Sequence, residues 1–355
     1  MTRSQDNLWL HRFALLTAAS TLFLIWLGGL VTSHGAGMAV PDWPTTYGYN
    51  MFFFPISRWV GGIFYEHSHR LVASGIGFLT VILTVWLWLK DERRWLRRLG
   101  YVALVAVVLQ GVLGGLRVTQ MKDVIGVFHA TLAQMFFALL CSIAMFTSRW
   151  WRVSFKTTTT MGNLHGAGAI RHAFAIVTGV ILVQLIIGAT MRHQHAGLAI
   201  PDFPAAYGKL WPAMDADSVA RYNQARGELT ATNPITAFQI GVQMVHRFMA
   251  LAILLSVAWL AGAARRAQPG TALSKGTAFW LGLILVQAAL GVFTIWTNKA
   301  ADVATAHVAI GALSLVTGVL LSIVIAVRSR SSTSQAPSQI SQRGMVASQS
   351  GQVTT

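Results

Sequence analysis

The chain has 355 residues, of which 54% are hydrophobic and only 11% are charged. Soluble domains carry roughly 25% charged residues, so a deficit of this size indicates a membrane protein. The formal net charge of +16 suggests a nucleic-acid partner at first sight, but the positions of the basic residues point to membrane topology instead. The single cysteine, Cys141, excludes an intrachain disulfide and a cysteine metal cluster.

Eight apolar stretches are long enough to span a bilayer, which takes about 20 residues. They predict helices at 13–31, 62–89, 99–116, 124–146, 173–191, 240–262, 277–297 and 303–327. No small-residue cleavage site follows the first stretch, so we interpret it as a retained helix and not as a signal peptide. The fold class is therefore all-α and polytopic.

The polar segments between and around these stretches complete the predicted organisation. Segment 1–12 is a short N-terminus, and 149–172 links the fourth helix to the fifth. Segment 329–355 is rich in Ser, Gln and Thr and is predicted to be a disordered tail.

The basic residues predict the orientation in the membrane. With the N-terminus in the cytoplasm, 17 of the 27 Lys and Arg residues and only three acidic residues fall on the cytoplasmic side. This excess satisfies the positive-inside rule with both termini inside. We therefore predict a multi-pass protein of the bacterial cytoplasmic membrane, in contact with the lipid bilayer and with no nucleic-acid partner.

The sequence repeats itself. Segment 36–44 recurs with conservative differences as 196–204, and His69-Arg70 recurs as His246-Arg247, 177 residues later. His129 matches His307. Because each repeat contains an even number of helices, both halves insert in the same orientation. The sequence predicts two pseudo-symmetric four-helix bundles, 13–148 and 173–328, related by an axis along the membrane normal.

Four histidines lie inside the predicted helices at similar depth: His69, His129, His246 and His307. At 1.5 Å per residue they lie roughly 6 to 11 Å below the outer surface. Two neutral imidazoles on facing helices can ligate a haem iron. A lone buried histidine is more often a hydrogen-bonded packing residue, but ionisable groups in a membrane indicate function. Four of them in a repeated pattern favour iron ligation, with one pair in each half.

Small and charged residues accompany these histidines. Glycines recur on the odd-numbered helices, where they serve either haem clearance or close helix packing; they are Gly28, Gly29, Gly114, Gly115, Gly188 and Gly291. Arg70 and Arg247 each follow a candidate ligand. They either pair with haem propionates or extend their side chains to the membrane interface.

One position differs between the halves. Glu66 lies three residues before His69 on the same helix face, and Gln243 takes the corresponding place before His246. A titratable carboxylate beside one site only predicts reaction in the first half and a supporting role for the second. The alternative is a helix-start glutamate that the helix dipole favours.

The outer loops carry a repeated proline motif, at 41–44 and 201–204. Its prolines stiffen an extended backbone. The loops are either lids over the haem sites or turns that hold an aromatic anchor at the interface.

These features resemble the haem A synthase (CtaA/Cox15) family over about residues 10–328. The motifs that carry the resemblance are Glu66-His67-Ser68-His69-Arg70, Phe128-His129-Ala130, Val245-His246-Arg247, Ala306-His307 and the loop Pro41-Asp42-Trp43-Pro44. Some family members have a cysteine pair in an outer loop. The outer loops here have none, so the chain resembles the cysteine-free subgroup.

The resemblance implies an oxidoreductase that converts haem O to haem A. In this reaction a ring methyl becomes a formyl through two successive hydroxylations and loss of water. The resemblance further implies that His69 and His129, with Arg70, frame the substrate haem. Glu66 would be the catalytic carboxylate that stabilises a carbocation-like centre on the ring methyl.

In the second half, the resemblance implies that His246 and His307, with Arg247, hold a resident haem b that passes electrons. Family proteins work with haem O synthase and supply haem-copper cytochrome oxidases. An electron-transfer partner of unknown identity is expected, and a homo-oligomer stays open.

Two other function classes compete with the enzyme. A cytochrome b-type electron-transfer subunit would hold two bis-histidine haems and modify neither, but it has no need of a carboxylate at one site only. A secondary transporter with histidine proton relays would have broken helices, and no predicted helix here has a central proline.

Overall fold

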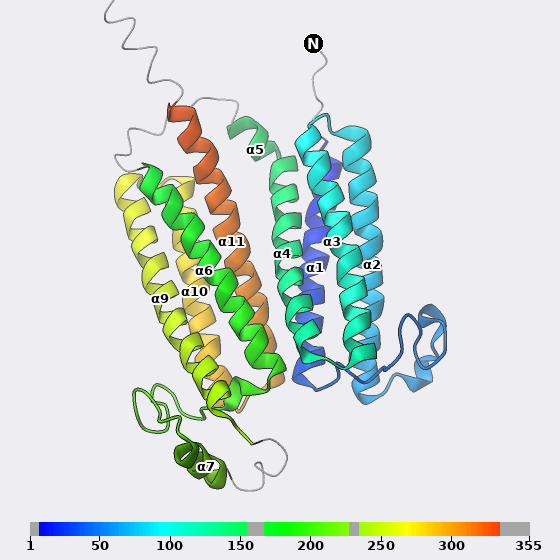
Figure 1. Cartoon of the computed structure of the whole chain (residues 1–355). Coiled ribbons are helices and arrows are strands. Elements are labelled where there is room, and N and C mark those ends of the chain that lie inside the picture. Colours follow the sequence, from blue (N-terminus) through cyan, green and yellow to red (C-terminus); the bar gives the residue numbers. More distant parts are fainter. Residues whose placement is uncertain (1–6, 155–166, 227–233, 334–355) are drawn as a thin grey trace, which may run out of the picture.

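The computed structural model of the chain describes residues 7–154, 167–226 and 234–333, and over these it is all-α (Figure 1). Eight of the described helices are long and apolar enough to cross a membrane. They are α1 Leu8–Ser33, α2 Gly61–Lys90, α3 Arg94–Gln120, α4 Asp123–Thr147, α6 Ala167–His193, α9 Ala237–Ala267, α10 Ala272–Trp296 and α11 Ala301–Thr333. Each predicted stretch falls inside its helix to within one residue, so the prediction of eight membrane helices is confirmed.

Shorter elements lie at the two ends of the bundle. Helix α5 (Arg149–Ser154) follows α4 at the end where α1 begins. The opposite end carries α7 (Ala216–Ala225) and the turns η1 (Met51–Phe53), η2 (Ile56–Arg58) and η3 (Ala196–Leu198) (Figure 1). We call this opposite end the loop end.

The predicted linker and tail are only partly described. Residues 149–154 and 167–172 of the linker are helical, and α11 continues to Thr333 inside the predicted tail. Residues 155–166 and 334–355 lie outside the described part of the chain, and the prediction of a disordered tail falls largely on them.

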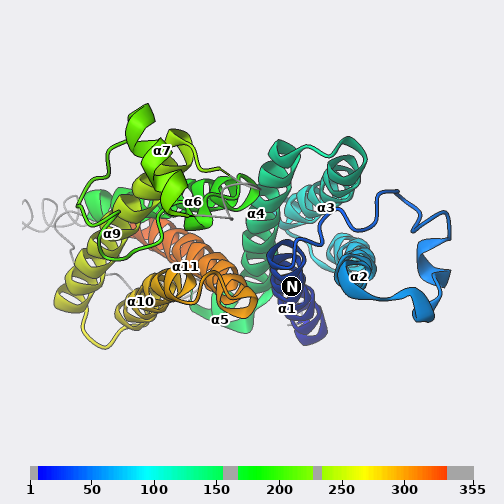
Figure 2. The ribbon, with the colours of Figure 1, turned by 90° about the horizontal axis from the view of Figure 1, so that it is seen from below.

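The helices form two groups that stand side by side, α1–α4 and α6 with α9–α11 (Figure 2). Helix α1 packs against α11, α4 packs against α6, and α4 also packs against α11. We call this junction of α1, α4, α6 and α11 the seam. It brings the helix of His129 and the helix of His307 next to each other.

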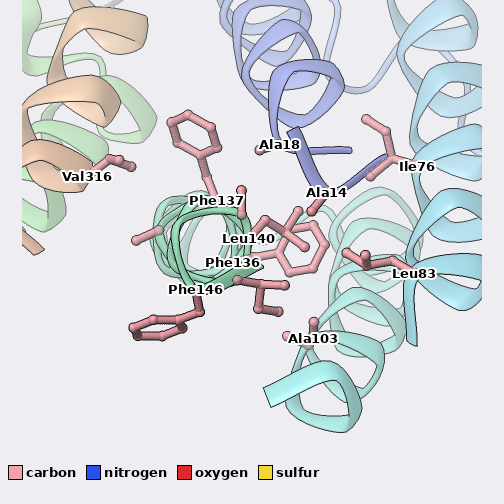
Figure 3. Close-up of a cluster of buried hydrophobic side chains, with 14 of the residues drawn as sticks. Ala14, Ala18, Ile76, Leu83, Ala103, Phe136, Phe137, Leu140, Phe146 and Val316 are labelled. Atoms are coloured by element: carbon pink, nitrogen blue, oxygen red, sulfur yellow. The ribbon is translucent and has the colours of Figure 1, made fainter. Parts of the chain in front are cut away.

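A buried apolar cluster surrounds α4 (Figure 3). Leu140 is fully buried among Ala14 of α1 and Ala103 of α3, and Val316 of α11 joins the cluster from the other half. Helices in lipid associate through close packing and not through exclusion from water, and these alanines allow the close approach. Large apolar side chains such as Phe78 remain exposed on the outer surface, as expected for a surface that faces lipid.

The two loops that the repeat predicts share one local structure. The carboxylate of Asp42 accepts hydrogen bonds from the backbone N–H groups of Tyr47 (2.8 Å) and Gly48 (2.9 Å). Asp202 accepts the same pair of bonds in the second half, at 2.8 and 2.9 Å. In both loops the peptide bond between the aromatic residue and the second proline is cis. The loops thus match in three dimensions, and the axis that would relate the whole halves stays a prediction.

Candidate functional site

Each of the four predicted ligands lies on a different helix, near the loop end. His69 is on α2, His129 on α4, His246 on α9 and His307 on α11. Each lies between six and nine residues from the start of its helix, which is roughly 9 to 14 Å along the helix axis. The structure therefore places all four at one level of the bundle.

Each histidine ring faces a glycine on the preceding membrane helix. The contacts join His69 to Gly28, His129 to Gly114, His246 to Gly188 and His307 to Gly291. A methyl group added at these glycines would lie 3.2 to 3.5 Å from the imidazole. The absence of a side chain at these glycines therefore lets each imidazole lie close to the neighbouring helix. Both explanations, haem clearance and close helix packing, are compatible with this contact.

The second pair has a spacing that suits axial ligation. The ring centroids of His246 and His307 are 6.4 Å apart. Two imidazoles on opposite sides of one metal, each with a bond of about 2 Å, have centroids roughly 6 Å apart. Nδ1 of His307 lies 3.0 Å from the backbone oxygen of Gln287. Such a bond orients a ligating imidazole and leaves Nε2 for the metal.

Gln287 also contacts the other ring nitrogen of His307. Its side-chain nitrogen lies 3.3 Å from Nε2, so iron binding at Nε2 requires this amide to move. In the same half, Nδ1 of His246 is buried without a hydrogen-bond partner among the described residues. Buried polar nitrogens normally have a partner, so Nδ1 of His246 is available to bind a group from outside the chain.

The first pair shares part of this arrangement. His69 and His129 lie near each other. Nδ1 of His129 is buried without a partner in the described structure, and the backbone oxygen of His129 accepts a hydrogen bond from Gln110 at 3.0 Å. Two neutral nitrogen donors per site match the axial ligand set of a haem iron. The residues present therefore fit a haem at both pairs.

Ligand sets that use more protein side chains are not present in the described residues. No group of three or more His, Cys, Asp and Glu side chains there is arranged to hold a metal ion. A haem iron, whose equatorial ligands come from the macrocycle, takes only two protein ligands. The arrangement thus suits haem better than a bare metal ion.

Glu66 and Gln243 share a structural role that the sequence did not indicate. Oε2 of Glu66 accepts a hydrogen bond from the backbone N–H of Val40 at 2.9 Å. Oε1 of Gln243 accepts the corresponding bond from Ile200 at 2.7 Å. Both side chains are buried, and each fixes its loop to the helix that carries a histidine. The two residues differ in the second contact, because Oε1 of Glu66 also pairs with Arg70 at 2.7 Å.

The two arginines beside the ligands bind the loops. Arg70 donates to the backbone oxygens of Asp42 (2.6 Å), Val40 (2.6 Å) and Thr45 (3.1 Å). Arg247 donates to the backbone oxygens of Asp202 (2.7 Å) and Ala205 (2.9 Å). The side chains of both arginines thus bind loop backbone, which is neither of the two roles that the sequence suggested, pairing with propionates or extension to the membrane interface. The pairing of both arginines with propionates stays a prediction.

The first loop also contacts the helix that faces His129. A methyl group at Gly115 would lie 2.5 Å from the indole ring of Trp43, so this ring packs directly on α3. Gly114, the preceding residue, faces His129. The contact places an aromatic side chain beside the first histidine pair, as the lid interpretation of the loop requires.

The structure also places near the seam several basic residues that the sequence analysis did not single out. They are Arg117 on α3, Arg192 and His193 on α6, and Lys299 after α10. No sequence motif marked them, because the first half has no counterpart of Arg192 and the second has none of Arg117.

Comparison with known proteins now decides the family. The family model COX15-CtaA, described as a cytochrome oxidase assembly protein, matches residues 11–320. The chain belongs to the COX15-CtaA family. The match runs from within α1 to within α11, and so includes both histidine pairs and both loops.

Relatives in the COX15-CtaA family are similar over most of their length. The chain is 27% identical to the Heme A synthase of Geobacillus kaustophilus, with 83% of this chain and 84% of that protein covered. It is 30% identical to the Heme A synthase of Chelativorans sp., with 72% and 67% covered. It is 24% identical to the Heme A synthase of Lysinibacillus sphaericus, with 91% and 96% covered.

Proposed function

We propose that this protein is a haem A synthase, a multi-pass membrane oxidoreductase that converts haem O to haem A. Membership of the COX15-CtaA family and the similarity to several proteins named Heme A synthase support this activity. The observation that carries it in the structure is the set of four histidines at one level, each facing a glycine. A chain built this way can present two haem sites.

The first half is the site of reaction in this proposal. His69 and His129 flank the iron of haem O, and the loop with Trp43 covers one side of the site. The bound substrate supplies the ring methyl that is oxidised to a formyl. The protein holds the macrocycle against Gly28 and Gly114 and keeps water from it.

Glu66 is the proposed catalytic carboxylate. Its two oxygens are fixed by Val40 and Arg70, so its negative charge has a set position one helical turn before His69. A fixed negative charge stabilises positive charge that develops nearby, without reorganisation at the moment of reaction. Gln243 has the same position in the second half and the same loop contact, but as an amide it carries no charge.

The second half holds a resident haem b between His246 and His307 in this proposal. Their centroid separation supports it. When bound, the haem supplies one-electron redox chemistry. Within the protein, Gln287 orients His307 through its backbone oxygen.

The proposed orientation follows the charge distribution. Both termini lie in the cytoplasm of a bacterial cell, and the loop end and both haem sites lie toward the outer face. The divisions at 13–148 and 173–328 then correspond to the substrate half and the haem b half. Haem O synthase as the source of substrate and a haem-copper oxidase as the recipient of product complete the proposal.

The test is the haem content of the wild type and of Glu66→Gln, purified from a host that makes haem O and has no haem A. The wild type is expected to contain haem b together with haem O, haem A or a hydroxylated intermediate. The variant is expected to keep haem b and haem O and to form no haem A, since the amide keeps the contact with Val40 as Gln243 does with Ile200. Chromatography and mass spectrometry of the extracted haems make the measurement.

The matched control is Gln243→Glu, which is expected to leave haem A formation in place. Normal haem A output from Glu66→Gln would refute the role of Glu66. Two equivalents of haem b in the wild type, with no conversion of haem O, would instead identify an electron-transfer cytochrome. A wild type without any haem would refute both functions.

A further inference from the structure

Positive charge collects at the loop end of the seam. Arg117, Arg192 and Lys299 lie there half-buried, and we call them the seam cations. Arg117 interacts electrostatically with Arg192, and Arg192 interacts with Lys299. The ion pairs among the described residues join other side chains, Arg70 to Glu66 and Arg93 to Asp91. The seam cations therefore repel one another, and none forms an ion pair with a carboxylate in the described structure.

The hydrogen-bond donors of these arginines are largely unused. A guanidinium has five N–H donors. Arg70 directs both terminal nitrogens at the first loop and at Glu66. Arg192 donates from Nη2 alone, to the backbone oxygen of Gly29 and to Oγ of Ser33. Its Nη1 and Nε have no partner among the described residues, and Nε is buried.

Arg117 is the extreme case. None of its five donors has a partner within the described parts of the chain, and its Nε is buried. Its guanidinium lies against the first loop, since a methyl group at Gly37 would lie 2.6 Å from Nη2. Glu66 and Asp123 affect it electrostatically from beyond ion-pair distance. Buried donors without acceptors are costly, so this side chain has the properties of a group that awaits an anion.

The two arginines among the seam cations lie near the candidate iron ligands. Arg117 interacts electrostatically with His69 and His129, and Arg192 interacts with His307. Arg117 thus lies within electrostatic range of both histidines of its own half, and Arg192 within range of one histidine of its own half. The repeat does not require them, because the positions that correspond to Arg117 and Arg192 are Thr294 and Thr32.

We propose that the seam cations bind the carboxylates of the two haems, Arg117 those of the first site and Arg192 with Lys299 those of the second. The inference rests on the proposed function, since it needs a tetrapyrrole at each histidine pair. A planar guanidinium with free donors suits a carboxylate, which it can bind through two parallel hydrogen bonds. The phosphate of an anionic lipid offers similar chemistry, but the proximity of the cations to the histidines favours the haem carboxylates.

The test is a titration of haem-free protein with haemin and with haemin dimethyl ester, in which both carboxylates are blocked. The wild type is expected to bind haemin at least about tenfold more tightly than the ester, because a hydrogen bond to a charged group is lost at each cation. Arg117→Gln and Arg192→Gln are expected to reduce this preference, and Arg117→Lys to keep part of it. Lys209→Gln is the control, since Lys209 is an exposed residue of the second loop.

Equal affinity of the wild type for haemin and its ester would overturn the inference without reference to any variant. A full preference in both glutamine variants would overturn it as well. Lipid phosphate that copurifies with the wild type and is lost from the variants, with no ester preference, would assign the seam cations to a lipid. Conversion of haem O to haem A is measured separately, so the proposed function can stand when this inference fails.

Discussion

Gly114→Ala separates the two explanations of the glycines that face the histidines. A methyl group at Gly114 would lie 3.5 Å from Cε1 of His129, an ordinary van der Waals contact. Helix packing alone therefore accommodates it. Alanine also favours a helix over glycine by about 0.5 to 1 kcal/mol. If Gly114 serves only helix packing, the variant keeps or gains stability and binds haem normally.

A haem beside His129 changes this expectation. The macrocycle then fills the space next to the ring, and an added methyl group overpacks it at a cost of about 1 to 3 kcal/mol. We expect haem affinity at the first site to fall roughly 5- to 150-fold. Stability of the haem-free protein should stay equal to that of the wild type or rise slightly.

The assay compares haem affinity by optical titration with thermal unfolding followed by tryptophan fluorescence. Gly111→Ala is the matched control, because Gly111 lies one turn earlier on α3 and has nothing within 4 Å of an added methyl group. Unchanged haem affinity in Gly114→Ala, together with a gain in stability, would refute haem clearance and leave helix packing as the explanation.

Two further predictions concern the second site and the first loop. His246→Ala is expected to remove one haem equivalent and its bis-histidine optical spectrum while the haem of the first site remains, which haem quantification per protein checks. Burial raises the pKa of Asp42, but hydrogen bonds from Gly48, Thr45 and Tyr47 outweigh it and place the pKa below the usual range. A lowered pKa in the folded state stabilises the fold above the unfolded pKa of about 3.9, and this contribution is lost as the pH falls through the folded value. Asp42→Asn should therefore lower the thermal stability at pH 7 and show a weaker loss of stability between pH 5 and 3 than the wild type; equal acid sensitivity would contradict this role.

The membrane helices were predictable because a single property determines them. An apolar stretch of about 20 residues must form a helix in lipid, where the backbone has no other hydrogen-bond partner. The similar depth of the four histidines was predictable as well, because each lies a similar number of residues after the start of its helix. The repeat also predicted which residues correspond, and the structure places His69 and His246 against equivalent glycines.

Contacts between distant segments were not predictable in the same way. The sequence drew attention to Glu66 and Gln243 through their difference, but nothing in it revealed that both bind the loop backbone. Arg70 attracted attention because it follows a ligand, yet its donors are directed at the first loop. Arg117 has no local motif, and its importance depends on which helices meet at the seam.

The helix contacts at the seam bear on how the two halves of the chain arose. Helix α1 packs on α11, and α4 packs on α6; by the repeat, these are one contact with the two halves exchanged. An isologous dimer of single four-helix chains would make this contact twice. In such a dimer the two sites would have to be identical. Joining the copies into one polypeptide removes that constraint. Position 66 can then be a carboxylate while the equivalent position 243 is an amide, and each half can carry its own arginine at the junction.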